Sequence, residues 1–247
     1  MSRDTKFWLL VSIIFVGFVL RIVGINFGLP YIYTTEEYKV VNYALKMGAT
    51  KDLNPHFFNY PSLYLYFTLF VSGIYFIIGR IFGVFTSAQD FAYSFIRNPT
   101  GIYLILRTFS VIWSTGAVLM TYLIGKEIYN RRTGLLAMLI LAVQPAIVFY
   151  AHEIRPSHPS LFFVLLSFYF LLKFYKTGEY KFFYFSASIL GVATSIFYNA
   201  LPMILLLPIV YFMVMLDPPS LKLRQAGKSS NYNIFKLFRE RKLWFAL

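Results

Sequence analysis

The sequence has no cysteine, few charged residues and only 10 acidic residues against 23 lysines and arginines. Without cysteine the chain has no disulfide, no thiolate metal ligand and no thiol nucleophile. Charged residues make up 13% of the chain and hydrophobic residues 58%, whereas ordinary soluble domains have about 25% and about 45–50%. We therefore expect an integral membrane protein, because most of this surface must face something other than water.

Long apolar runs predict an all-α polytopic integral membrane protein, since about 17–25 apolar residues cross a bilayer core as a helix. The first span, 7–28, follows the basic residues Arg3 and Lys6 and lacks a small-residue cleavage site. This pattern indicates an uncleaved first span rather than a signal peptide. Arg21, near its far end, is expected to extend to the membrane interface. The further expected spans are 101–125, 134–150, 159–175, 182–198, 200–216 and one that starts at 243.

The charge distribution indicates that the apolar run 62–79, unlike the other runs, does not cross the membrane. If it crossed, most lysines and arginines, Arg131 and Arg132 among them, would lie opposite the N-terminus, which inverts the positive-inside rule. We therefore expect 62–79 to be juxtamembrane or re-entrant. Residues 29–100 then form one long outer loop with juxtamembrane helices, 217–242 form a cytoplasmic loop, and the chain is a single transmembrane domain. The positive charge orients the protein in its membrane rather than binding nucleic acid.

Two adjacent carboxylates, Glu36 and Glu37, follow the first span. After this pair, apolar and polar residues recur with the period of a helix, so that each kind falls on its own face, which predicts an amphipathic helix. Thr34 and Glu37 have the spacing of a capping box, in which both side chains bond free backbone N–H groups at a helix start. This spacing gives Glu37 a structural explanation and leaves Glu36 without one.

Four stretches follow one another in a familiar order: "GLPYIYTTEEY", "DLNPHFFNYPSLYLY", a long block from "RTFSVIW" to "YAHEIRPSHPSLFF", and "GVATSIFYNALP". They resemble successive blocks of the GT-C glycosyltransferases, in particular the dolichyl-phosphate-mannose protein mannosyltransferases and the bacterial aminoarabinose transferase. The resemblance runs from 15 to 216 and corresponds to the N-terminal half of such enzymes. It implies a GT-C-like helical bundle and an inverting enzyme that moves a sugar from a polyprenyl-phosphate carrier to an acceptor on the non-cytoplasmic face.

The resemblance also implies which acidic residues act. The family places an acidic pair just after the first span, here Glu36 and Glu37, and we expect Glu36 to be the base or the carboxylate that orients the acceptor. A second acid belongs to the outer loop "YAHEIRPSHPS". One alignment places Ser157 at its position, so that the acid is lost. Another, which we prefer, matches Glu153 and Arg155, although these two residues can also form a local ion pair.

The family lysine that meets the carrier phosphate corresponds to Phe197, so Arg155 or Arg107 must supply that charge. Arg107 lies inside a span, where a charged residue is either functional or paired within the bundle. A divalent metal ion is left open as a cofactor, with Glu36 and His152 as candidate ligands, although no ligand spacing repeats on one helix face. The other expected substrate-binding residues are His152, His158, His56, Asn59, Tyr60 and Asn199.

The leading hypothesis is therefore a membrane glycosyltransferase with a polyprenyl-phosphate sugar donor and a lipid, glycan or protein acceptor. We expect it in the cell membrane of a prokaryote, among membrane lipids, with a cytoplasmic N-terminus and an outer active site. The alternative is a non-catalytic or degenerate GT-C-like subunit that binds a polyprenyl lipid or a partner protein. Phe197 and the short chain, which suggests a fragment or a split protein, favour the alternative. A transporter ranks third, because paired interrupted spans are not evident.

Overall fold

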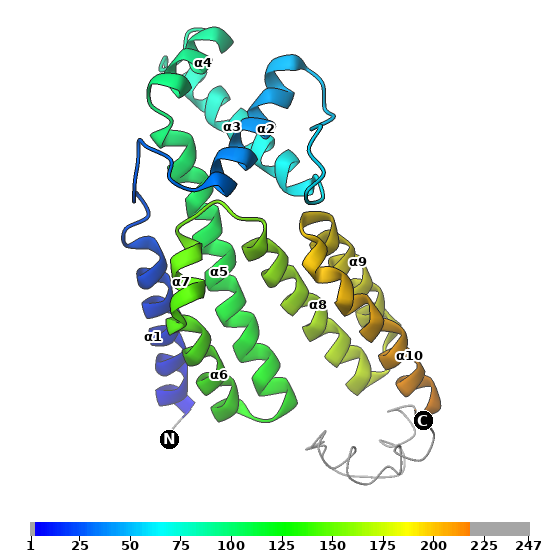
Figure 1. The fold of residues 1–247 in the computed structure, drawn as a ribbon. Coiled ribbons are helices and arrows are strands. Elements are labelled where there is room, and N and C mark those ends of the chain that lie inside the picture. Colours follow the sequence, from blue (N-terminus) through cyan, green and yellow to red (C-terminus); the bar gives the residue numbers. More distant parts are fainter. Residues whose placement is uncertain (1–2, 218–247) are drawn as a thin grey trace.

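The computed structural model describes residues 3–217, and every regular element in that range is a helix. Figure 1 shows a bundle of long helices with a layer of further helices at one of its ends. The predicted loop 217–242, apart from Asp217, and the predicted span from 243 lie outside the described residues.

The bundle helices run up and down between two ends (Figure 1). The bundle elements are α1 (Arg3–Ile22), α5 (Thr100–Ile128), α6 (Arg131–Val143), α7 (Pro145–Ala151), α8 (Ser157–Thr177), α9 (Tyr180–Ile196), the 3-10 helix η1 (Tyr198–Leu205) and α10 (Leu206–Leu216). The start of α1 and the end of α10 lie at one end, and the layer of further helices lies at the other.

Length and hydropathy identify four helices that can cross a membrane, counting Tyr198–Leu216 as one, and a fifth if the bent pair α6 and α7 is one span. Large apolar side chains such as Phe15, Ile140 and Phe212 are more than half exposed, as expected of surfaces that face lipid. The prediction of an all-α polytopic membrane protein is confirmed.

The layer at the end of the bundle consists of α2 (Thr35–Thr50), α3 (Leu63–Ile81) and α4 (Ala88–Arg97). By length and hydropathy α3 qualifies as a span. Figure 1 nevertheless places it with α2 and α4, beyond the ends of the bundle helices rather than beside them. Val40, Val41 and Ala44 of α2 are fully buried in one apolar core with Leu65 of α3. This packing supports the prediction that 62–79 makes no net crossing.

Arg21 does not extend to the interface, and that prediction is wrong. Its side chain is fully buried and donates to the hydroxyl of Ser114 at 2.8 Å, to the carbonyls of Ala142 at 2.8 Å and Leu141 at 3.1 Å, and to a carbonyl of its own helix. The carbonyls of Leu141 and Ala142 lie just before the break between α6 and α7. At this break Pro145 has no N–H to donate to the Leu141 carbonyl. The Arg21 guanidinium therefore donates hydrogen bonds to carbonyls at the point where the helix is broken. Its four hydrogen bonds compensate the cost of burying its charge.

Candidate active site

Glu37, in the first turn of α2, is fully buried and binds Arg107 of α5 with both carboxylate oxygens. Arg107 Nε donates to Oε1 at 2.8 Å and Nη2 to Oε2 at 2.7 Å. The backbone N–H of Ile154 donates to Oε1 at 2.9 Å, and the hydroxyl of Thr34 donates to Oε2 at 2.9 Å. Burial of this ion pair is tolerated because the remaining lone pairs are satisfied. Glu37 thus joins α2, α5 and the loop between α7 and α8.

The capping-box prediction is wrong, although α2 does begin after Thr34. Thr34 is in the extended conformation of an N-cap residue, but its side chain makes no cap hydrogen bond to the backbone. Its hydroxyl donates to Glu37 instead, because that carboxylate points toward Arg107 and not back toward the helix start.

The guanidinium of Arg107 also fixes the segment that follows α1. Its Nη1 donates to the carbonyls of Ile25 at 2.8 Å and Phe27 at 2.7 Å. The Arg107 side chain is 3% exposed. Of the two roles expected for Arg107, the paired one is observed. We therefore leave Glu37 and Arg107 out of the groups that contact substrate.

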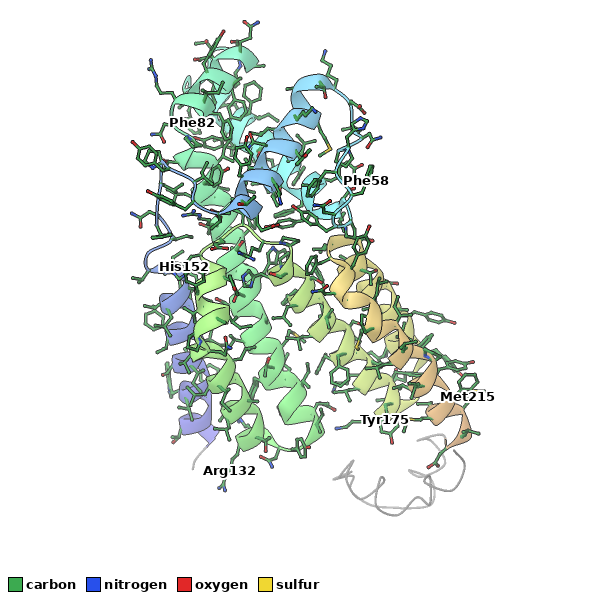
Figure 2. All side chains as sticks on the ribbon, viewed as in Figure 1. Phe58, Phe82, Arg132, His152, Tyr175 and Met215 are labelled. Carbon is green, nitrogen blue, oxygen red and sulfur yellow. The ribbon has the colours of Figure 1, made fainter. Side chains whose placement is uncertain are left out.

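A cavity of about 330 Å³ lies where four segments meet, at the boundary between α2–α4 and the bundle. Glu36 lines it from α2, and Arg155 from the loop before α8. Phe58, labelled in Figure 2, marks the loop between α2 and α3, which contributes the third wall. The lining residues are Glu36, Lys39, Phe57, Asn59, Tyr60, Arg155, Pro156, Ser157 and Phe197.

The cavity holds one carboxylate and two cations. Glu36 is 38% exposed, and its Oε1 lies 3.7 Å from Nζ of Lys39, one helical turn further along α2. Arg155 is held from two sides: its Nε donates to a carboxylate oxygen of Glu153, and its guanidinium lies 4.4 Å from the centroid of the Tyr150 ring. The local ion pair of Glu153 and Arg155 is therefore present, and Glu153, 8% exposed, fixes Arg155 at the cavity wall.

Tyr60 supplies an unpaired hydrogen-bond donor. Its side chain is 4% exposed, and its hydroxyl has no hydrogen-bond partner within the described part of the chain. The ring packs edge-on against Phe57, with centroids 4.9 Å apart, and against Phe197 at 6.5 Å. Burial raises the pKa of Tyr60, and the negative charge of Glu36 raises it further. The phenol is therefore neutral and available to a ligand.

The structure does not bring four predicted substrate-binding residues into this cavity. His56 lies in the loop after α2, where its Nε2 contacts Asp52 at 2.9 Å, and it lines a different pocket. Asn199 is exposed on η1. His158 is buried at the start of α8, and its Nε2 has no hydrogen-bond partner among residues 3–217. His152, labelled at the end of α7 in Figure 2, places its ring nitrogens 2.9 Å and 2.8 Å from the carbonyls of Val148 and Val23.

The contacts of His152 also bear on whether a divalent metal ion binds, a question that the sequence did not decide. Both ring nitrogens of His152 face carbonyl oxygens of the protein, so neither nitrogen is directed at an ion. Within residues 3–217 no group of three or more histidine or acidic side chains is arranged to hold a metal. The residues therefore do not fit a divalent ion, and we derive no chemistry through one.

Sequence reasoning missed Lys39 and Phe57 as residues of the cavity. Lys39 did carry a signal, because its spacing of three residues from Glu36 places both on one side of the helix. Phe57 carried no signal beyond the aromatic richness of its stretch. Phe197, which stands where the family has lysine, does line the cavity, as an apolar wall.

Comparison with known proteins gives one match. The sequence model of the dolichyl-phosphate-mannose-protein mannosyltransferase family matches residues 103–229, which include Glu153, Arg155 and Phe197 but not Glu36. No curated protein and no solved structure is detectably similar to the chain. Since the match covers more than half of the 247 residues, the chain belongs to the dolichyl-phosphate-mannose-protein mannosyltransferase family and is a membrane glycosyltransferase of GT-C type.

Proposed function

We propose that this protein transfers a sugar from a polyprenyl-phosphate donor to a hydroxyl group of a lipid, glycan or protein acceptor, with inversion at the anomeric carbon. One observation carries the proposal: Arg155 lines the same cavity as Glu36 and Lys39 of α2, although it lies more than 100 residues further along the sequence. A base for the acceptor and cations for the donor phosphate are thus within one site.

The reaction needs little beyond these groups. The acceptor oxygen attacks the anomeric carbon, the bond from that carbon to the phosphate oxygen breaks, and the acceptor proton passes to Glu36. The phosphate leaves as a stable anion, which a positioned cation stabilises further. Arg155 suits that role because its planar guanidinium matches phosphate oxygens. Glu153 and Tyr150 hold it in place before substrate binds, which limits the cost of ordering it.

The remaining lining residues fit a bound sugar phosphate. The hydroxyl of Tyr60 has no hydrogen-bond partner in the described range 3–217 and can donate to a sugar or phosphate oxygen. The rings of Phe57 and Phe197 offer apolar walls for a sugar face or the first isoprene unit. Lys39 offsets part of the negative charge of Glu36 until the donor phosphate arrives.

We place the site on the outer face of the cell membrane, with the N-terminus in the cytoplasm. The basic residues Lys126, Arg131 and Arg132 surround the turn between α5 and α6, at the bundle end opposite α2–α4 (Figure 1). The positive-inside rule supports the cytoplasm for that end.

The test is sugar transfer by the reconstituted protein from a panel of labelled polyprenyl-phosphate sugars. Glu36→Gln should lower the rate at least about a hundredfold, the usual effect of removing a positioned base. Glu36→Asp should retain part of the rate, since it keeps the carboxylate but moves its oxygens by about 1 Å. Glu179→Gln is the matched control, because Glu179 is an exposed carboxylate at the turn between α8 and α9 that pairs with Lys181.

Two results would contradict the proposal. Equal rates for the wild type and Glu36→Gln would remove Glu36 from the chemistry. No transfer by the wild type from any donor would favour the non-catalytic subunit, which the apolar Phe197 at the family's lysine position also favours.

A further inference from the structure

A second cavity, of about 490 Å³, lies between α2, α3 and α4. It shares no lining residue with the cavity that holds Glu36. Its walls are predominantly apolar and include Leu45, Leu69, Phe76 and Phe91. Its volume is within the range of about 300–1,000 Å³ that is usual for small-molecule sites. This groove is thus a separate candidate site, and it does not rest on the proposed transfer reaction.

Small residues keep the groove open. Gly48, Gly73, Ala49 and Ala92 lie among its lining residues. A Cβ atom built on Gly73 would meet no heavy atom within 4 Å, so the helix at this point faces empty space rather than a packed neighbour. Close packing normally fills a volume of this size between helices, so the groove is a candidate site for a ligand.

Three polar residues interrupt the apolar lining, and one of them, Asn42, already donates its amide N–H to the Tyr38 carbonyl of its own helix. Lys46 is the single charged residue among the lining residues, and it is exposed at the rim. Ser72 of α3 is 2% exposed, and its hydroxyl has no hydrogen-bond partner within residues 3–217. A buried hydroxyl without a partner is costly, so a ligand with an acceptor atom would be stabilised there. The groove therefore suits an apolar chain that carries an oxygen acceptor and an anionic head.

The surroundings of the groove are apolar on the outside as well. Ile81, Phe82 and Val84 at the end of α3 are 74%, 79% and 64% exposed, and Ile96 of α4, which lines the groove, is 77% exposed. Exposed apolar side chains on amphipathic helices insert into the boundary between lipid headgroups and acyl chains. Ile96, which both lines the groove and is exposed, is thus suited to contact lipid.

We infer that the groove between α2, α3 and α4 binds one anionic phospholipid. An acyl chain lies against the apolar walls, the Ser72 hydroxyl donates to an ester carbonyl, and the Lys46 ammonium pairs with the phosphate. A polyprenyl phosphate fits less well, because an isoprenoid chain has no acceptor for Ser72. A basic peptide segment fits less well because the lining residues carry no acidic side chain to pair with it.

The experiment uses the full chain in nanodiscs that contain phosphatidylglycerol with a photoreactive group on one acyl chain. Irradiation should label peptides of α2, α3 and α4. In Gly73→Leu the added Cβ meets no heavy atom within 4 Å, and the rest of the side chain occupies the groove, so this variant should reduce that labelling at least fivefold. Gly191→Leu, on the exposed face of α9 with no heavy atom within 4 Å of its added Cβ, is the matched control and should leave it unchanged.

A second variant tests the head group without altering the groove. Lys46→Gln should reduce labelling by phosphatidylglycerol several-fold and leave labelling by the same photoreactive phosphatidylcholine unchanged. Equal labelling of the wild type and Gly73→Leu would overturn the site. Equal phosphatidylglycerol labelling of the wild type and Lys46→Gln would overturn the anionic head group. Displacement of the label by polyprenyl phosphate at lower concentration than by phosphatidylglycerol would assign the groove to the isoprenoid instead.

Discussion

Glu36 and Glu37 are neighbours in the sequence but have different environments. Successive residues of an α-helix point about 100° apart, since a turn takes 3.6 residues. Glu37 therefore faces Arg107 inside the protein, and Glu36 faces the cavity. The sequence identified the pair and predicted that one member is structural. It could not identify the structural contact, because the partner lies 70 residues away on another helix.

Glu37→Gln should destabilise the protein without acting on the chemistry directly. It leaves the buried guanidinium of Arg107 without its carboxylate, and removal of one member of a buried ion pair costs about 3–5 kcal/mol. Thermal unfolding in detergent should show a lowered midpoint for Glu37→Gln and an unchanged one for Glu36→Gln. The midpoint of the double variant Glu37→Gln/Arg107→Gln should fall by less than the sum of the decreases in the two single variants. An unchanged midpoint together with lost transfer would return Glu37 to the catalytic residues.

Tyr60→Phe should lower the transfer rate by about tenfold, the effect expected for one lost hydrogen bond. Burial raises the pKa of Tyr60, so its phenol stays protonated and remains a donor through neutral and mildly alkaline pH. The ratio of the wild-type and Tyr60→Phe rates should therefore be constant from about pH 6 to pH 9, below the ordinary phenol pKa of about 10. A ratio that falls to one as the pH rises would show that the phenol ionises in this range.

At the scale of elements, the expected spans lie close to the observed helices, because apolar runs determine where helices form. The run 134–150 is an exception, since the structure divides it into α6 and α7 at an angle of 58°. Pro145 was the available signal for this break, because proline removes a helical N–H and bends the helix. The sequence could not show that Arg21 would supply the missing donors.

The start of α4 should depend on pH through Asp90. Ser87 Oγ accepts from the Asp90 N–H, and Asp90 accepts in return from the N–H and the hydroxyl of Thr86. These Thr86 bonds lower the pKa of Asp90. A lowered folded-state pKa means that the bonds stabilise α4 above the ordinary carboxyl pKa and are lost as the pH falls through the folded-state value.

Hydrogen exchange measured after equilibration at each pH should therefore show the first turn of α4 losing protection below about pH 4. Asp90→Asn should remove most of that pH dependence, and Ser87→Ala should lower protection at every pH because it removes the N-cap. If the wild type and Asp90→Asn showed the same pH dependence, another group would control this turn.

At the scale of the whole molecule, the charge distribution predicted more than single motifs did. Membership of the family was recognised from the order of its blocks, and the match to residues 103–229 confirms it. The positive-inside rule predicted that 29–100 form one loop on the outer face. Figure 1 shows α2–α4 together at the bundle end away from the N-terminus, and the side of the membrane on which they lie stays a prediction. The two cavities were not predicted, because each is formed by residues that only packing brings together.

Topology is the last prediction, and the absence of cysteine makes it simple to test. Figure 2 labels Phe58 and Arg132 at opposite ends of the molecule, and both are exposed. In intact cells that express the protein, Phe58→Cys should react with a membrane-impermeant maleimide, whereas Arg132→Cys should react only after the membrane is permeabilised. Both should react equally in detergent, which controls for accessibility. If Arg132→Cys reacted from outside and Phe58→Cys did not, the positive-inside argument would fail and the cavity with Glu36 would face the cytoplasm.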